Sequence, residues 1–173
     1  MKILFVIANQ GFQPTEYFIP KQLLTEAGFV VESASDAAGV ATASDGREQM
    51  VDVTLEKVEA KNYDGIYFIG GSGALKHLDN QESNRILNEA LILQKSYGAI
   101  CISPRILARA NVLTGHKATG WDEDGELGEI FANNNVEYVH EAVVQDSPVI
   151  TGSGPEAAEA WGRAIYTHLC TKT

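Results

Sequence analysis

The sequence predicts a single α/β domain in which helices cover a mostly parallel sheet. Two observations point to this class. Short apolar runs of strand length alternate along the chain with longer segments of helical periodicity. The apolar runs are continuous, as is typical of strands that are buried on both faces of a parallel sheet. The length of 173 residues suits one domain, so residues 1–173 are expected to form one.

The first strand, loop and helix are the clearest of the expected elements. The apolar run Ile3–Ala8 predicts a buried strand, and residues 9–14 are expected to form a loop. Thr15 is expected to cap a helix over Glu16–Ala27, which Gly28 would end. Glu16 is therefore placed in the first turn of a helix that follows a strand.

The rest of the chain continues this alternation. The small and polar residues 35–46 are expected to form a loop or a short hairpin. Further strands are predicted over residues 29–34, 50–55, 64–69, 99–102, 115–119, 136–144 and 148–151. Further helices are predicted over residues 83–95, 104–109, 126–132 and 156–169.

Composition limits the classes of function. The 13 Lys and Arg residues stand against 23 Asp and Glu residues, and the net charge of −10 argues against nucleic acid and anionic membranes as partners. The apolar start is too short for a signal or membrane segment. Two cysteines, Cys101 and Cys170, are too few for a disulfide framework, which favours a reducing, cytoplasmic location.

The segment around Cys101 predicts a nucleophile elbow between a strand and a helix. The short apolar run Ala99–Ile102 contains Cys101, and Pro104 suits the first turn of the following helix, so Cys101 is expected on the tight turn between them. The amides and the dipole of a helix N-terminus favour an anion, so we expect the thiol pKa to lie below the value of about 8.5 for free cysteine. The alternative is a cysteine that is buried in the core without a chemical role.

Two further loops are expected beside Cys101, because ligands collect at the carboxyl ends of parallel strands. These are the loop before Glu16 and the loop at Gly70-Gly71. If Glu16 and Cys101 lie within hydrogen-bond reach, one of them must hold a proton, and a protonated Glu16 donating to a thiolate is expected. The amides of Gly71 and Ile102 would then form an oxyanion hole. The alternative for Glu16 is a first-turn acid that interacts only with the helix dipole.

The histidines do not clearly belong to this group. His77 follows the glycine-rich loop and is the one candidate near it, but a surface or structural histidine is the more common case. No spacing of His, Cys, Asp and Glu resembles a metal site. The run Gly70-Gly71-Ser72-Gly73 lacks both the dinucleotide and the Walker pattern. Neither a metal nor a cofactor is predicted.

Several segments together resemble the DJ-1/PfpI superfamily. They occur in the family's order, cover nearly the whole chain, and comprise Glu16–Pro20, Ala27-Gly28, Tyr63-Asp64 with Gly70-Gly71, Ala99–Cys101 with Pro104 and Leu107-Ala108, Leu113–Thr119 and Ile150–Pro155. The resemblance implies a flavodoxin-like three-layer sandwich, a homodimer, a small-molecule substrate, and a reactive cysteine at Cys101 paired with Glu16. It also makes Gly70 a candidate pocket residue.

The chain departs from the family pattern in both places where members carry a histidine. Protease-type members have His-Gly directly after the cysteine, whereas this chain has Ile102 and Ser103. Where the deglycase-like branch has its histidine, this chain has Trp121. Peptidase activity is therefore not expected. Ser103 suggests a slightly altered elbow, Trp121 is a candidate pocket residue, and Arg105 either steadies an anion in the pocket or is solvated.

Three classes of function remain open. The preferred one is an enzyme that uses Cys101 and Glu16 on small reactive carbonyls such as methylglyoxal, in the manner of a glyoxalase or deglycase, with an isonitrile-hydratase-like reaction as a close variant. The second is a redox-sensing stress protein or holdase chaperone in which Cys101 oxidises to a sulfinate. The third is an interaction protein that keeps the fold but has a disabled site.

Overall fold

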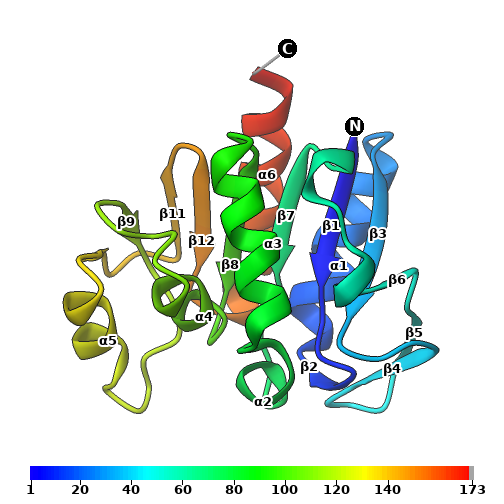
Figure 1. The fold of residues 1–173 in the computed structure, drawn as a ribbon, viewed down its shortest axis with the longest axis horizontal. Helices are drawn as coiled ribbons and strands as arrows, with labels where there is room; N and C mark the ends of the chain where they lie inside the picture. The colour runs from blue at the N-terminus through cyan, green and yellow to red at the C-terminus, as the bar shows by residue number, and fades with distance from the viewer. Residues whose placement is uncertain (172–173) are drawn as a thin grey trace.

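The computed structural model describes residues 1–171, and within them it places a central seven-stranded sheet and two small ones. The central sheet has the order β11-β12-β8-β7-β1-β3-β6 (Figure 1). The strands are β1 (Lys2–Val6), β2 (Gln10–Phe12), β3 (Val30–Ser35), β4 (Val40–Ala43), β5 (Glu48–Met50), β6 (Val53–Thr54), β7 (Gly65–Phe68), β8 (Ser96–Ile100), β9 (Lys117–Ala118), β10 (Glu137–Tyr138), β11 (Val143–Asp146) and β12 (Val149–Gly152).

The predicted class is confirmed, because every neighbouring pair in the central sheet is parallel except β11 with β12. Five parallel strands run across the sheet as β3-β1-β7-β8-β12, which in chain order is 2-1-3-4-5. This is the flavodoxin-like order that the resemblance implied. The carboxyl ends of β1, β7, β8 and β12 therefore lie along one edge.

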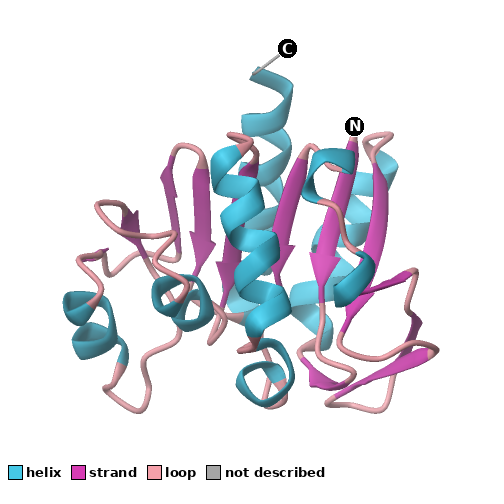
Figure 2. Ribbon diagram, in the orientation of Figure 1, coloured by secondary structure: helices cyan, strands magenta, loops and turns pink. Residues whose placement is uncertain are grey.

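Helices cover both faces of this sheet, as Figure 2 shows in cyan against the magenta strands. Helices α1 and α6 pack together behind the sheet, and α3 lies across its front (Figure 1). The helices are α1 (Pro14–Glu26), α2 (Ala74–Leu78), α3 (Gln81–Ile92), α4 (Pro104–Arg109), α5 (Leu127–Asn133) and α6 (Ala158–Thr171), with 3-10 turns η1 (Leu55–Lys57), η2 (Ala60–Asn62) and η3 (Pro155–Ala157).

The core lies between the sheet and its two helical layers. Trp161 of α6 stacks on Phe5 of β1 at 6.1 Å and meets Tyr67 of β7 edge-on at 5.7 Å, and all three side chains are fully buried. Gly162 allows α6 to approach α1 closely, since a Cβ there would lie 3.1 Å from Pro20 Cα. These contacts fix α1, and with it Glu16, against the sheet.

Several predicted boundaries shift in the structure. Helix α1 begins before Glu16, because Gln13 rather than Thr15 is its N-cap and accepts a hydrogen bond from the Thr15 amide at 2.6 Å. The segment expected as a loop or hairpin supplies β4, which pairs with β2 and β5 in a separate sheet. The single strand predicted over residues 136–144 is wrong, since β10 pairs with β9 and β11 joins the central sheet.

No helix within residues 1–171 is both long and apolar enough to cross a bilayer.

Candidate functional site

Cys101 lies at the turn from β8 to α4, as the elbow prediction placed it. Its φ of +63° is a left-handed conformation that side-chain-bearing residues rarely adopt. Backbone hydrogen bonds hold the turn on both sides: the Cys101 amide donates to the Gly152 carbonyl at 2.9 Å, and the Trp121 amide donates to the Cys101 carbonyl at 2.7 Å. The elbow is therefore anchored to the end of β12 and to the loop after β9.

Glu16 projects from the first turn of α1 into the same region and is fully buried. Its Oε2 accepts a hydrogen bond from the Gly70 amide at 3.0 Å. Its Oε1 is also buried, and the carboxyl is hydrogen-bonded to the Cys101 thiol. Burial raises the pKa of this carboxyl from its usual 4.5 to about 7, against smaller opposing effects of the Cys101 thiol and the Gly70 amide. Such a group can hold or release a proton near neutral pH.

The thiol of Cys101 does not have the lowered pKa that the elbow predicted. Burial, the charge of Glu16 and a hydrogen bond with its carboxyl raise the pKa of Cys101 from 9.0 to about 12. The amides of Ile102 and Gly71 donate toward the sulfur and lower the pKa, but by less. Burial has a larger effect on the thiol pKa than the amides at the helix end, and burial cannot be read from the local sequence.

Together, the two groups carry one negative charge and one proton between about pH 7 and pH 12. A second charge is excluded because both side chains are largely buried and interact directly. Because the pKa of Glu16 is the lower of the two, this proton lies mainly on sulfur, so the expected protonated Glu16 beside a thiolate is the less populated arrangement. The proton can pass from sulfur to the carboxyl oxygen without crossing solvent. The structure thus brings Glu16, Cys101, Gly71 and Ile102 together, as the sequence suggested.

The glycine loop is shaped by close contacts that tolerate no side chain. A Cβ on Gly70 would lie 2.6 Å from Cys101 Cβ and 2.7 Å from Glu16 Oε2. Gly71 has a φ of +115°, and a Cβ there would lie 2.4 Å from the Gly11 carbonyl oxygen. Both glycines are required for the loop to reach the thiol and the carboxyl.

Ser103 and Arg105 serve the framework around the thiol. Ser103 is buried, and its hydroxyl donates to the Ile69 carbonyl at 2.8 Å, which ties the elbow to the end of β7. Arg105 is not solvated, because it is only 2% exposed and forms an ion pair with Asp124 at 2.6 Å. The solvated interpretation of Arg105 was wrong because sequence spacing does not reveal that the loop carrying Asp124 folds back over α4. Its role in steadying an anion stays a prediction.

The described contacts of the histidines are with other groups. His77 pairs with Asp36 at 2.6 Å, and His116 pairs with Asp146 at 3.1 Å. His140 packs on Tyr138, and His168 lies near Gln145. Within residues 1–171, no three His, Cys, Asp or Glu side chains are grouped to hold a metal ion. The ionisable side chain that contacts the Cys101 thiol is Glu16.

A cavity of about 540 Å³ adjoins the elbow. Its walls come from the two segments that hold the Cys101 backbone, the loop after β9 and the loop after β12. Trp121 lines it, whereas Cys101 and Glu16 are not among its lining residues. The second wall was not among the predicted site residues. The lining residues are Gly120, Trp121, Asp122, Glu123, Ser153, Gly154, Pro155 and Glu156. The run Gly152–Pro155 carried part of the family resemblance and was the signal that could have identified this wall.

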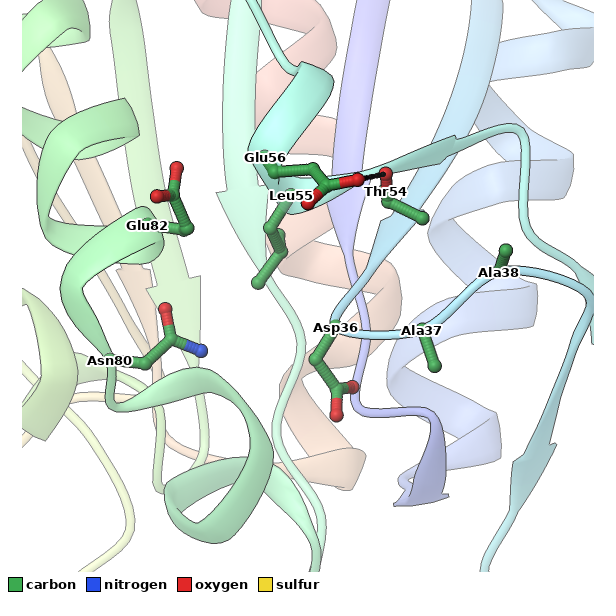
Figure 3. A pocket seen from close by; sticks show the side chains of 8 residues that line it. All are labelled: Asp36, Ala37, Ala38, Thr54, Leu55, Glu56, Asn80 and Glu82. Atoms are coloured by element: carbon green, nitrogen blue, oxygen red, sulfur yellow. Dashed lines mark hydrogen bonds between the residues drawn. The ribbon is translucent and has the colours of Figure 1, made fainter.

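A second cavity, of about 370 Å³, lies away from the elbow (Figure 3). It is bounded by the residues after β3, the turn η1 and the start of α3, with β1 and β7 between β3 and the strand that leads to Cys101. Its lining includes the carboxylates of Asp36, Glu56 and Glu82 and none of the predicted site residues. The cavity at the elbow, by contrast, is lined by Trp121.

Known proteins resemble the chain in both sequence and fold. It is 31% identical over 169 residues to the protein named deglycase PH1704 of Pyrococcus horikoshii, covering 98% of this chain and 99% of the relative. The protein named deglycase PfpI of Pyrococcus furiosus matches to the same extent.

Solved structures agree with these relatives. A ThiJ/PfpI domain protein from Brachyspira murdochii superposes with a TM-score of 0.93 at 26% identity, covering 98% of this chain and 96% of the other. Drosophila melanogaster DJ-1beta superposes with a TM-score of 0.86 at 25% identity, covering 97% of this chain and 89% of the other. The DJ-1/PfpI family model matches residues 1–168, which include Glu16, the glycine loop and the elbow, and the chain therefore belongs to the DJ-1/PfpI family.

Proposed function

We propose that this protein is a cysteine-dependent enzyme that acts on small reactive carbonyl compounds, with Cys101 as nucleophile and Glu16 as proton carrier. The observation that carries the proposal is the buried Glu16–Cys101 pair, which retains one proton from about pH 7 to pH 12. The two relatives named deglycases support the same class of chemistry. The carboxyl supplies the proton transfer for which other cysteine enzymes use histidine.

In the first step the thiol proton passes to the Glu16 carboxylate, and the resulting thiolate adds to the aldehyde carbon of a substrate such as methylglyoxal. A carbon–sulfur bond forms, the carbonyl electron pair moves to oxygen, and the proton of Glu16 passes to that oxygen to give a hemithioacetal. The amides of Gly71 and Ile102, which donate toward the sulfur, are available to the oxygen as negative charge develops on it.

The remaining steps need only a proton carrier and water. The Glu16 carboxylate removes the proton from the carbon bonded to sulfur and returns it to the neighbouring carbon. The hydroxyl proton of the hemithioacetal passes to the oxygen on that neighbouring carbon, which leaves the thioester of a 2-hydroxy acid. Water then cleaves the thioester, releasing a 2-hydroxy acid and restoring the thiol. The net reaction adds one water to the substrate, and no electron donor or acceptor is required.

Turnover of methylglyoxal, followed by formation of lactate, tests this proposal. Cys101→Ser and Glu16→Ala should each lose nearly all turnover, because one removes the nucleophile and the other the proton carrier. Cys170→Ser is the control, since Cys170 is exposed on α6, and it should keep wild-type turnover. Full turnover in either site variant would refute the proposal.

A second candidate function is oxidation sensing at Cys101. It is favoured by the amides that donate toward the sulfur and by the buried Glu16 Oε1, which when protonated could donate to a sulfinate oxygen. Intact-mass analysis after mild peroxide treatment should show oxygen added at Cys101 and not at Cys170. Equal oxidation of both cysteines would count against this function.

A further inference from the structure

The loop that forms one wall of the cavity at the elbow has no regular secondary structure between β9 and the start of α5. It carries Trp121, whose amide is bound to the Cys101 carbonyl at 2.7 Å and whose side chain lines the cavity. Because ladder and helix hydrogen bonds are absent here, side-chain contacts act together with this backbone hydrogen bond to determine where the loop lies.

Arg105 supplies the contacts that reach from the elbow helix to this loop. Its guanidinium donates to the Trp121 carbonyl at 3.3 Å and to Asp124 Oδ1 at 2.6 Å. A third contact joins it to Glu126 Oε2 at 3.3 Å. The guanidinium carbon also lies 5.4 Å from the centre of the Trp121 ring, within cation–π range.

The burial of Arg105 makes these contacts strongly directional. Its side chain is 2% exposed, whereas the side chains of Asp124 and Glu126 are 32% and 68% exposed. Both terminal nitrogens of the guanidinium are matched by acceptors, whereas Nε is buried without a hydrogen-bond partner among the described residues. The planar fork of the guanidinium fixes the positions of these acceptors. The buried Arg105 guanidinium is not hydrated, so its interactions with the loop replace its contacts with water and hold the loop in place.

We propose that Arg105 is a positioning residue that holds Trp121 against the elbow and thereby limits the size of molecules that reach the Cys101 sulfur. The inference deepens the proposed function, since it takes Cys101 as the reacting group. Arg105 itself acts only through the loop. A loosened loop should admit larger reagents without changing the intrinsic reactivity of the thiol.

The test compares two reagents with the same reactive group, iodoacetamide and N-pyrenyl iodoacetamide, in a Cys170→Ser background. Arg105→Met should raise the ratio of the bulky to the small alkylation rate about tenfold, the change that corresponds to loss of one charge-assisted hydrogen bond. Trp121→Ala should raise the ratio at least as much, and the double variant should show no further increase. Arg105→Lys should give an intermediate ratio, because it keeps the charge but loses the fork.

Arg109→Met is the matched control, because Arg109 lies on the same helix and pairs with Asp79 at 2.5 Å, away from the Trp121 loop. Its ratio of bulky to small alkylation rates should equal that of the Cys170→Ser parent. Asp124→Asn weakens the same contact from the loop side and covers the case in which Arg105→Met fails to fold. Its ratio should also rise, by a smaller factor than that of Arg105→Met.

An unchanged ratio in folded Arg105→Met or Asp124→Asn, or an equal rise in Arg109→Met, would overturn the proposal. Acrylamide quenching gives a second readout, since Trp121 is partly exposed while Trp161 is fully buried. Quenching should increase in Arg105→Met and not in Arg109→Met. Both readouts are independent of carbonyl turnover, so a failure of the proposed function would leave this test intact.

Discussion

Glu16 lies beside the thiol of Cys101, in a position to take or return a proton as histidine does in many cysteine enzymes. Its suitability comes from burial, which raises its pKa to about 7 and lets it exchange a proton near neutral pH. Sulfur and carboxyl cannot both be charged in so dry an environment. The chemistry of the site follows from where their single shared proton resides.

The pH dependence of Cys101 alkylation should report this shared proton. In a Cys170→Ser background, the rate should rise with a midpoint near pH 7, where the pair first becomes charged, and rise again toward pH 12. Glu16→Gln should abolish the rise in alkylation rate near pH 7. It should also move the remaining midpoint below 12, because it removes a charge that disfavours the thiolate. A profile that is identical in the parent and the Glu16→Gln variant would contradict the pairing.

Protein stability should also depend on Glu16. The folded chain binds the carboxyl proton more tightly than the unfolded chain, because burial raises the pKa from 4.5 to about 7. Stability from this group is full below about pH 4.5 and is lost as the pH rises through 7, by about 3 kcal/mol in total. Urea unfolding at pH 5 and pH 8 should show this loss in the wild type and not in Glu16→Gln. The exposed Glu129→Gln variant should behave as the wild type does.

At the scale of secondary-structure elements, three loops from separate units converge at one edge of the sheet. The start of α1 brings Glu16, the loop after β7 brings the two glycines, and the turn after β8 brings Cys101. The Gly70 carbonyl accepts the Gln13 amide at 2.9 Å, so the glycine loop is hydrogen-bonded directly to the N-cap of α1. The distance between carboxyl and thiol therefore depends on the backbone of this loop.

Gly70→Ala should disturb the site more than its small size suggests. The new methyl would lie within 3 Å of both Cys101 and Glu16, so the loop must move and the pair must separate. We expect alkylation of Cys101 to lose its midpoint near pH 7 and the protein to be destabilised by about 1–3 kcal/mol. Gly128→Ala, where the nearest atom would be 3.9 Å away, is the control and should change neither property. A wild-type profile in Gly70→Ala would contradict the role of this contact.

At the scale of the whole molecule, electrostatics should select among carbonyl substrates. The net charge is −10, and the cavity is lined by the carboxylates of Asp122, Glu123 and Glu156 with no lysine or arginine among its lining residues. Negative potential in a cavity lowers the local concentration of anions. Neutral carbonyls should therefore be preferred to anionic ones.

Comparing kcat/KM for methylglyoxal and for the anion glyoxylate tests this preference. We expect glyoxylate to be disfavoured by about tenfold at low salt, with the difference shrinking as ionic strength screens the carboxylates. Glu156→Gln should raise the value for glyoxylate more than that for methylglyoxal. Glu159→Gln on α6, which does not line the cavity, should leave both unchanged. Equal kcat/KM values at low salt would contradict the expectation.

We propose that two copies of the chain form a homodimer, as the family resemblance implied. Light scattering in solution should give twice the 18.7 kDa mass of one chain. A mass equal to that of one chain at all concentrations would contradict it.

Much of this protein is determined by local sequence. The apolar runs specified β1, β7, β8 and β12 because buried parallel strands need continuous apolar residues. Pro104 and the preceding apolar run located the elbow because each restricts the backbone locally. Family motifs then identified Glu16 as the partner of Cys101, which spacing alone could not, since 84 intervening residues separate them along the chain.

Only the tertiary structure decided the properties that depend on burial and on contacts between distant segments. The thiol pKa rises because several elements together exclude water and place a carboxyl beside it, and neither effect is visible in the elbow itself. Arg105 is buried and paired with Asp124 because the loop that carries Asp124 folds back over α4. The short strands β2, β9 and β10 form because partners elsewhere complete their hydrogen bonds, which no local pattern records.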